Sequence, residues 1–348
     1  EEYEHGVVIV AVGAKESRPA EYLLGADPRV MTQAEFEQLL ADNPDQAKRY
    51  GRVAMIQCVG SRTPEHPNCS RICCAMAVKN ALKRGVKYGA ATVGNFCPKR
   101  PGCSRILAYH SIGYRDHETN VTPEDFRAQM AWLAKHQTVI TLGDAAEGIE
   151  GVAVTFDDGY RDVWLNAAPV LQNFGIPATV FIVPGGMGKM LPHDHDPLTS
   201  VLLNWDEAKR LQEAGIEIGG HALTRARLAR LDESGQRREI GKCSRYIQKR
   251  LGEAPRAFAY PYGSILDYND MSKMLLEEFG FSIGVSSRYG VNYPDCDPLD
   301  LRRIVIDSTD TLECVQDKVT GRLDPLAVLD SRLGAYSRRF VNRLLGTS

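Results

Sequence analysis

Short apolar runs alternate with longer amphipathic segments through the chain from residue 105 onward. The runs read RILAYHS, TVIT, VAVTF, ATVFIV, IEIGG, AFAYP and FSIGVSS, and each has the length of one buried strand. The amphipathic segments between them predict helices at 162–174, 206–214, 233–251 and 269–279. This alternation predicts a parallel sheet, and about seven repeats predict an α/β fold of the (β/α) barrel kind.

The part before residue 105 has a different pattern. HGVVIVAVGA and GRVAMIQCVGSR each predict a buried strand, Thr32 with Glu35 predicts a helix start, and AMAVKNALKRG predicts a short helix. This small α/β segment offers too little apolar surface for a comfortable core. Pro, Gly and basic residues replace the periodic pattern near its end. We therefore predict an N-terminal segment, a linker and a barrel, at 1–87, 88–104 and 105–321.

The last segment, 322–348, carries apolar residues at helical spacing with arginines between them. This pattern predicts an amphipathic helical tail. Such a helix either packs on its own domain or lies on an anionic membrane, and we favour packing. The apolar positions are Leu326, Leu329, Leu333, Tyr336, Phe340 and Leu344.

Composition narrows the class of protein only slightly. The 348 residues are 43% hydrophobic and 25% charged, with a formal net charge of -2, so nothing favours a nucleic-acid partner. No apolar run reaches the roughly 18 residues that a membrane span needs. The chain begins EEYEHG, without an initial Met and without a basic and apolar leader. We expect a cytoplasmic protein for the chain as given.

Two adjacent acids, Asp157 and Asp158, directly follow the VAVTF run. Reactive groups of such barrels lie at the carboxyl ends of the strands, so this strand would deliver both acids to the barrel mouth. Carboxylates held this close do not both ionise freely, which favours one as a base and the other beside a cation. The alternative is a helix cap beside a solvated acid.

Three other predicted strands end in polar groups. His110 follows ILAY, His221 follows IEIGG, and YPYG follows AFA. A single histidine after a strand is usually a structural group, but several at equivalent positions around one barrel favour a site. A base, a cation site, a hydrogen-bond donor and an acid are what amide hydrolysis requires.

The ordered motifs TFDDGY, EIGGHALTR and FAYPYG, preceded by ILAYHSI, resemble those of the polysaccharide deacetylase (NodB-homology) family over about 105–321. The resemblance implies a distorted (β/α) barrel and a hydrolase that removes acetyl groups from N-acetylated glycans with a divalent metal, commonly zinc. It implies Asp157 as the base, Asp158 and His221 as metal ligands, His110 as the acid, and the Tyr262 backbone N–H as the oxyanion donor.

The chain departs from this family at two positions. The second motif of the family has two histidines four positions apart, whereas here Arg225 follows His221 at that spacing. A guanidinium cannot ligate a metal, which leaves a catalytic zinc short of its usual three protein ligands. At the second position, Ala259 stands where many members have an arginine that orients the base.

Three hypotheses follow from Arg225. Either His193 or His195 of the LPHDHDP loop supplies the missing ligand, or Arg225 forks onto Asp158 in the place of the cation, or the domain binds glycans without hydrolysing them. The first two predict opposite metal contents, and the third predicts no acetate release.

Four cysteines crowd one short stretch of the N-terminal segment: Cys58, Cys69, Cys73 and Cys74. Thiolates at such density favour iron–sulfur or zinc binding over free buried thiols. IQCVGSR, CSRICC and VVIVAVGAKESRP resemble the flavin and iron–sulfur subunit of heterodisulfide reductase over about 2–85, which implies these four cysteines as ligands of a [4Fe-4S] cluster. The Gly-rich dinucleotide fingerprint is absent, which argues against flavin binding.

These two resemblances lead to two functional expectations. The first is a carbohydrate deacetylase acting on an N-acetylated glycan, impaired to the extent that Arg225 disrupts metal binding. The second is an iron–sulfur electron-transfer protein, with its own redox partner and a passive barrel. Because the two halves share no obvious chemistry, a chimeric reading frame is a further alternative.

Overall fold

The computed structural model describes residues 7–10, 30–32, 35, 53–56, 102–114, 117, 119–190 and 200–330. The chain divides into two compact units, Glu1–Gly89 and Ala90–Ser348.

The described part of the first unit is a small parallel sheet. Strands β1 (Val7–Val10), β2 (Val30–Thr32) and β3 (Val53–Ile56) pair in the order β2-β1-β3. The Thr32 N–H donates to Glu35 Oε2 over 2.7 Å, and the Glu35 N–H donates to Thr32 Oγ1 over 3.2 Å. This reciprocal pair is the capping box that the sequence predicts. The predicted helix ending at Gly85 lies outside the described residues.

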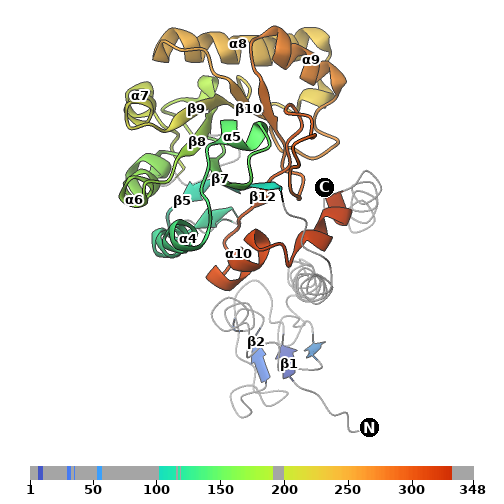
Figure 1. Ribbon diagram of the computed structural model, residues 1–348. Helices are drawn as coiled ribbons and strands as arrows, with labels where there is room; N and C mark the ends of the chain where they lie inside the picture. The colour runs from blue at the N-terminus through green and yellow to red at the C-terminus, as the bar shows by residue number, and fades with distance from the viewer. Residues whose placement is uncertain are drawn as a thin grey trace, which may run out of the picture. The chain divides into compact units, whose positions relative to one another are not determined.

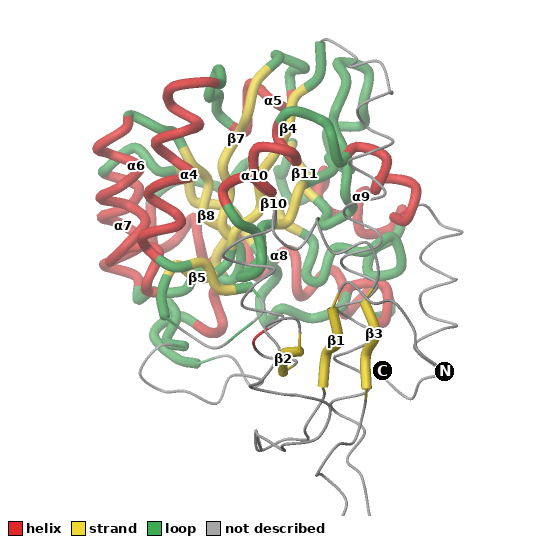
Figure 2. Tube along the Cα trace, turned by 90° about the horizontal axis from the view of Figure 1, so that it is seen from below, coloured by secondary structure: helices red, strands yellow, loops and turns green. Residues whose placement is uncertain are grey.

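The second unit is built on a seven-stranded parallel sheet in the order β11-β10-β9-β8-β7-β4-β12. From β11 to β12 along the sheet, the strands are Ile283–Val285, Ala257–Ala259, Glu217–Gly220, Ala178–Ile182, Gly151–Phe156, Ser104–Tyr109 and Ile304–Val305. Two further short strands, β5 (Ser111–Ile112) and β6 (Asn120–Val121), pair with each other. The sheet curls into a distorted barrel (Figures 1 and 2). The alternating pattern predicts the barrel, and the family resemblance implies its distortion.

One segment closes the curl of the sheet. Leu301 forms a parallel bridge with Val285 of β11, and Ile304, three residues later, pairs with Leu107 of β4. The same short segment therefore contacts β11 at one edge of the sheet and forms β12, the strand at the other edge. The sequence does not predict β12, because a strand of two residues, Ile304 and Val305, is too short to show a period.

Helices surround the sheet, as Figures 1 and 2 show. Several begin at a polar residue whose side chain accepts a hydrogen bond from the first turn, such as Thr122 before α4 and Asn269 before α9. Their bounds are α4 Pro123–His136, α5 Leu142–Ala146, α6 Ala168–Phe174, α7 Trp205–Glu213, α8 Glu233–Leu251, α9 Asp270–Glu278 and α10 Leu312–Val319. Short 3-10 turns occur at Pro184–Gly186, Leu228–Arg230 and Asp324–Asp330. No described helix has the length and apolarity needed to cross a bilayer.

Both faces of the sheet are buried, which explains why its strands are apolar along their whole length. On β4, Ile106 belongs to the cluster inside the barrel, whereas Leu107 and Tyr109 belong to the cluster under the helices. The outer cluster contains an aromatic group in which the Tyr109 and Phe126 rings meet edge to face with centroids 5.2 Å apart. This rigid double-sided packing fixes where each strand ends.

Two predicted elements differ from the structure. The TVIT run forms only one bridge, Val139 to Val152, because Thr141 at its end caps α5 through a reciprocal pair with Asp144. The helix predicted at 162–174 starts with a π turn, Val163–Ala167, before α6. Predicted strand and helix types are otherwise confirmed across the barrel. The apolar positions of the predicted tail from residue 328 onward lie outside the residues whose side chains the structure describes.

Gly219 on β9 tests how tightly the barrel is packed. A Cβ there would lie 2.5 Å from the Phe181 ring and 2.9 Å from the Ala257 carbonyl oxygen. We expect Gly219→Ala to lower the free energy of unfolding by about 1–3 kcal/mol, measured by urea denaturation. Gly143→Ala is the matched control, because its Cβ would meet only ordinary contacts from 3.5 Å outward. Equal stabilities of the two variants would contradict the expected packing.

Candidate active site at the carboxyl ends of the strands

Three strands of the sheet, β4, β7 and β9, end in acids and histidines that the sequence singles out. Asp157 and Asp158 follow β7, His110 follows β4, and His221 follows β9. Because Tyr109 and Phe156 are in register, with the Asp157 N–H donating to the Tyr109 carbonyl over 2.9 Å, the positions of His110 and Asp157 are equivalent on adjacent strands. The side chains of Asp157 and Asp158 are almost completely buried.

Asp157 is held by a guanidinium that the sequence does not single out. Arg303 Nη1 donates to Asp157 Oδ1 over 2.7 Å, and Nη2 donates to Oδ2 over 2.6 Å. Arg303 also donates through Nε to the Ser286 carbonyl over 2.7 Å and through Nη1 to Thr155 Oγ1 over 3.2 Å. The Arg303 side chain has no exposed surface. This is a bidentate buried ion pair in which each guanidinium nitrogen has at least one hydrogen-bond acceptor.

Arg303 makes the contact with Asp157 that the resemblance would assign to an arginine at position 259. It lies in the segment that closes the sheet, directly before β12, so its guanidinium reaches Asp157 from a different strand. The signal in the sequence was the Arg pair before the apolar residues of LRRIVID. Burial raises the pKa of Asp157, but the charge and hydrogen bonds of Arg303 outweigh it and leave the pKa below its usual value.

Asp158 is held by Arg225 in a second fork. Arg225 Nε donates to Asp158 Oδ1, and Nη2 donates to Oδ2 over 3.1 Å. Burial raises the pKa of Asp158. The hydrogen bond from His221 and the charge of Arg225 lower the pKa by more than burial raises it, so the net pKa lies well below its usual range. The fork is the arrangement that the second hypothesis about Arg225 describes.

His221 also faces Asp158. Its Nδ1 lies 2.8 Å from the Ala259 carbonyl oxygen, and because a carbonyl only accepts, Nδ1 carries a hydrogen. Its Nε2 lies 3.4 Å from Asp158 Oδ1. The hydrogen bond to the Ala259 carbonyl therefore fixes the His221 ring with its Nε2 facing Asp158.

Tyr262 lies beside Arg225 and keeps 43% of its surface exposed. The Arg225 and Arg227 guanidinium carbons lie 4.8 Å and 3.6 Å from the Tyr262 ring centroid. Arg227 in turn pairs with Asp267 at 2.5 Å. Among the described residues, the Tyr262 N–H donates to no protein acceptor, as an oxyanion donor requires.

Left-handed backbone is concentrated at this site. The non-glycine residues with positive φ in the described part of the chain are Asp158 (67°), Ala222 (57°), Arg225 (63°) and Tyr262 (64°). Each such residue costs on the order of 1–3 kcal/mol and persists only where its surroundings impose it. Three of the four carry side chains or backbone groups described above. This concentration of strain supports a functional site.

His110 completes the group of predicted residues. Its Nδ1 is buried and has no hydrogen-bond partner among the described residues. Burial lowers the pKa of His110, and the charges of Asp157 and Asp158 oppose this effect. His110 is thus close enough to feel both acids, and its catalytic role remains a prediction.

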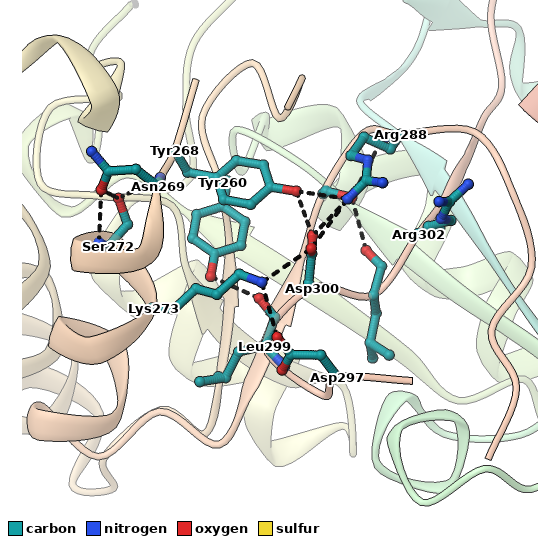
Figure 3. A network of polar contacts seen from close by, with 12 residues as sticks. Tyr260, Tyr268, Asn269, Ser272, Lys273, Arg288, Asp297, Leu299, Asp300 and Arg302 are labelled. Carbon is teal, nitrogen blue, oxygen red and sulfur yellow. Dashed lines mark hydrogen bonds and ion pairs between the residues drawn. The ribbon is translucent and has the colours of Figure 1, made fainter. Parts of the chain in front are cut away.

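A polar network holds the third motif, as Figure 3 shows. The Tyr260 ring stacks on the Tyr268 ring with centroids 4.0 Å apart, and the Tyr260 hydroxyl donates to the Leu299 carbonyl over 2.8 Å. Tyr268 donates to Asp300, which also accepts from Arg288 over 3.1 Å and from Lys273 over 3.0 Å. The network ties the strand end that carries Tyr262 to the segment that precedes Arg303.

The described residues do not fit a divalent metal at this site. Both carboxylate oxygens of Asp158 are taken by Arg225, and the described ranges contain no group of three or more His, Cys, Asp or Glu placed to hold a metal. Catalytic zinc normally has three protein ligands. His193 and His195 lie outside the described residues, so the hypothesis of a substitute ligand is untouched by this observation.

Residues 145–284 match the sequence model of the family described as polysaccharide deacetylase. The second unit contains a polysaccharide deacetylase domain. Members of this family generally depend on a divalent metal, which makes the Arg225 fork a departure from the usual site. The match does not extend to the cysteine-rich segment, and Cys58, Cys69, Cys73 and Cys74 lie outside the described residues. The iron–sulfur cluster and its redox partner therefore stay predictions.

Individual proteins agree with the family match. A poly-beta-1,6-N-acetyl-D-glucosamine N-deacetylase of Staphylococcus epidermidis is 28% identical over 212 residues, which cover 56% of this chain and 70% of that protein. The deacetylase PplD of Streptococcus pyogenes, solved in complex with acetate, shares the fold with a TM-score of 0.55 and 21% identity over 63% of this chain and 99% of that one. IcaB from Ammonifex degensii gives a TM-score of 0.54 and 22% identity over 64% and 98% of the two chains.

Arg303 provides a direct test of the buried charge pair in this deacetylase domain. Removing one partner of a buried pair leaves an uncompensated charge, so we expect Arg303→Ala to cost about 3–5 kcal/mol in urea denaturation at pH 7. Without Arg303, burial alone would raise the pKa of Asp157 above its unfolded value. The ionised carboxylate would then destabilise the fold at neutral pH, and the loss should shrink as the pH falls toward about 4.

Two further variants complete this test. The double variant Arg303→Ala/Asp157→Asn should be more stable at pH 7 than Arg303→Ala alone, because the unpaired charge is gone. Arg302→Ala, which changes the neighbouring arginine, should stay within about 0.5 kcal/mol of the unaltered protein. A loss in Arg303→Ala that is independent of pH would show that packing, rather than charge, explains it.

Proposed function

We propose that the deacetylase domain hydrolyses acetyl groups of an N-acetylated polysaccharide or oligosaccharide, or the corresponding O-acetyl esters. The observation that carries the proposal is the meeting of Asp158 with His221 beside Asp157, at the ends of β7 and β9, with Arg225 and the Tyr262 ring next to them. The family match and the named activity of the Staphylococcus epidermidis relative support a carbohydrate substrate.

Asp157 would accept the proton of the attacking water. The Arg303 fork keeps this carboxylate ionised and fixes its orientation, so it can act as a base without rearranging. Because its pKa lies below the usual value, Asp157 is a weak base. The site must therefore stabilise the developing negative charge strongly to complete the reaction.

The other two predicted groups would handle that charge and the leaving group. The Tyr262 N–H, which donates to no acceptor among the described residues, would donate to the oxyanion formed from the acetyl carbonyl. His110 would then give a proton to the leaving nitrogen. Burial lowers the pKa of His110, which makes its protonated form a readier proton donor. The products are acetate and a free amino sugar.

Acetate release is the test of this function. The intact chain should release acetate from N-acetylglucosamine oligomers, assayed with both β-1,6-linked and β-1,4-linked chains. Asp157→Asn should lower kcat by roughly 10²–10⁴-fold, because it removes the base but keeps the shape of the side chain.

Asp206→Asn serves as the control, since Asp206 lies exposed in the first turn of α7. This control should match the unaltered protein in kcat. Saturable binding of the oligomers without acetate release would overturn the proposal and favour a glycan-binding domain instead. Equal kcat values for Asp157→Asn and the unaltered protein would assign the base elsewhere.

A further inference from the structure

We propose that the Arg225 guanidinium is the resident cation of this site and replaces the divalent metal on which the family generally depends. This assignment concerns the same site and rests on the proposed function for the role of the cation. The test measures the amount of zinc bound per chain as well as the release of acetate.

The pairing geometry is the first support. A metal bound by Asp158 would need at least one carboxylate oxygen, and both are engaged by Arg225. The Asp158 side chain is 2% exposed and that of Arg225 is 14% exposed. Metal binding would therefore displace the Arg225 guanidinium from its buried partner Asp158, and the displaced guanidinium would need another negatively charged partner.

The backbone and the surrounding side chains also hold Arg225 in place. Its φ of 63° is left-handed, and its guanidinium carbon lies 4.8 Å from the Tyr262 ring centroid. The same ring contacts Arg227, which Asp267 anchors. The Thr224 N–H donates to Glu239 Oε2 over 2.8 Å, so the residue before Arg225 is fixed to helix α8. Contacts with Asp158 and the Tyr262 ring, and the attachment of Thr224 to α8, thus hold Arg225 in the site.

Arg225 retains donors for a substrate. Two of its five N–H groups contact Asp158, which leaves three with no protein acceptor among the described residues. Together with the Tyr262 N–H, these donors would stabilise the oxyanion of the acetyl group. Water would add to the carbonyl carbon and pass a proton to Asp157. The C–N bond would then break, with the nitrogen taking a proton from His110.

Zinc counting tests the proposal on the intact chain. Metal-free protein is titrated with Zn²⁺ in competition with a chromophoric chelator, and each protein is compared with its Asp158→Asn counterpart. Zinc held by cysteines elsewhere in the chain cancels in this difference. We expect a difference near zero for the unaltered protein, because Asp158 holds Arg225. In the Arg225→His background we expect about one equivalent that depends on Asp158, because a third ligand now exists.

Arg227→His is the matched control, since it places a histidine beside the same tyrosine ring but not on Asp158. It should gain no Asp158-dependent zinc. One such equivalent in the unaltered protein would overturn the proposal, and its loss in His193→Ala/His195→Ala would assign the metal to that loop. This first comparison needs no Arg225 variant, so it decides the proposal even if Arg225→His fails to fold.

Product assays separate this inference from the proposed function. Acetate release by the unaltered protein should change by less than about twofold after treatment with a chelator, since no metal takes part. Release that falls tenfold and returns with Zn²⁺ would overturn the inference but leave the function standing. Absence of acetate under all conditions would reject the function, while the zinc difference would still decide the identity of the cation.

Discussion

Two buried carboxylates on adjacent residues need compensating positive charge, and the arrangement of the site follows from that need. Asp157 and Asp158 are nearly inaccessible to water, so neither can stay ionised without a partner. The chain provides two guanidinium forks, one from Arg303 before β12 and one from Arg225 after β9. Because the partners come from opposite parts of the sheet, the charges are balanced only once the barrel has formed.

The two forks have different consequences. Arg303 is completely buried and donates hydrogen bonds to Asp157, Thr155 and the Ser286 carbonyl. These contacts suit a residue that holds Asp157 in one orientation. Arg225 keeps some exposure and unused donors, and it sits on strained backbone beside an exposed aromatic ring. The first fork therefore resembles a structural clamp, whereas the second is open toward a ligand.

The sequence pattern was sufficient for the barrel and for the acidic pair, because buried strands are uniformly apolar and their ends are marked by polar residues. VAVTF followed by two acids predicts both strand β7 and the position of the acidic pair at its carboxyl end. The pattern could not predict Arg303, since its partner lies 146 residues away in the chain and β12 is only two residues long. Nor could it distinguish the three hypotheses about Arg225, because only three-dimensional proximity shows that its guanidinium reaches Asp158.

Replacing a metal by a guanidinium has a chemical cost that follows from the properties of arginine. A bound zinc lowers the pKa of its water to roughly 7, whereas a guanidinium has no acceptor and cannot bind water as a ligand. As the proposed base, Asp157 would then have to remove the whole proton, although the Arg303 fork lowers its pKa and so weakens it as a base. The guanidinium would still stabilise the oxyanion, so the proposed site would hydrolyse its substrate slowly and without a metal. In the proposed mechanism the two forks would therefore limit the rate, because Arg303 orients the base but weakens it, and Arg225 supplies positive charge but does not activate water.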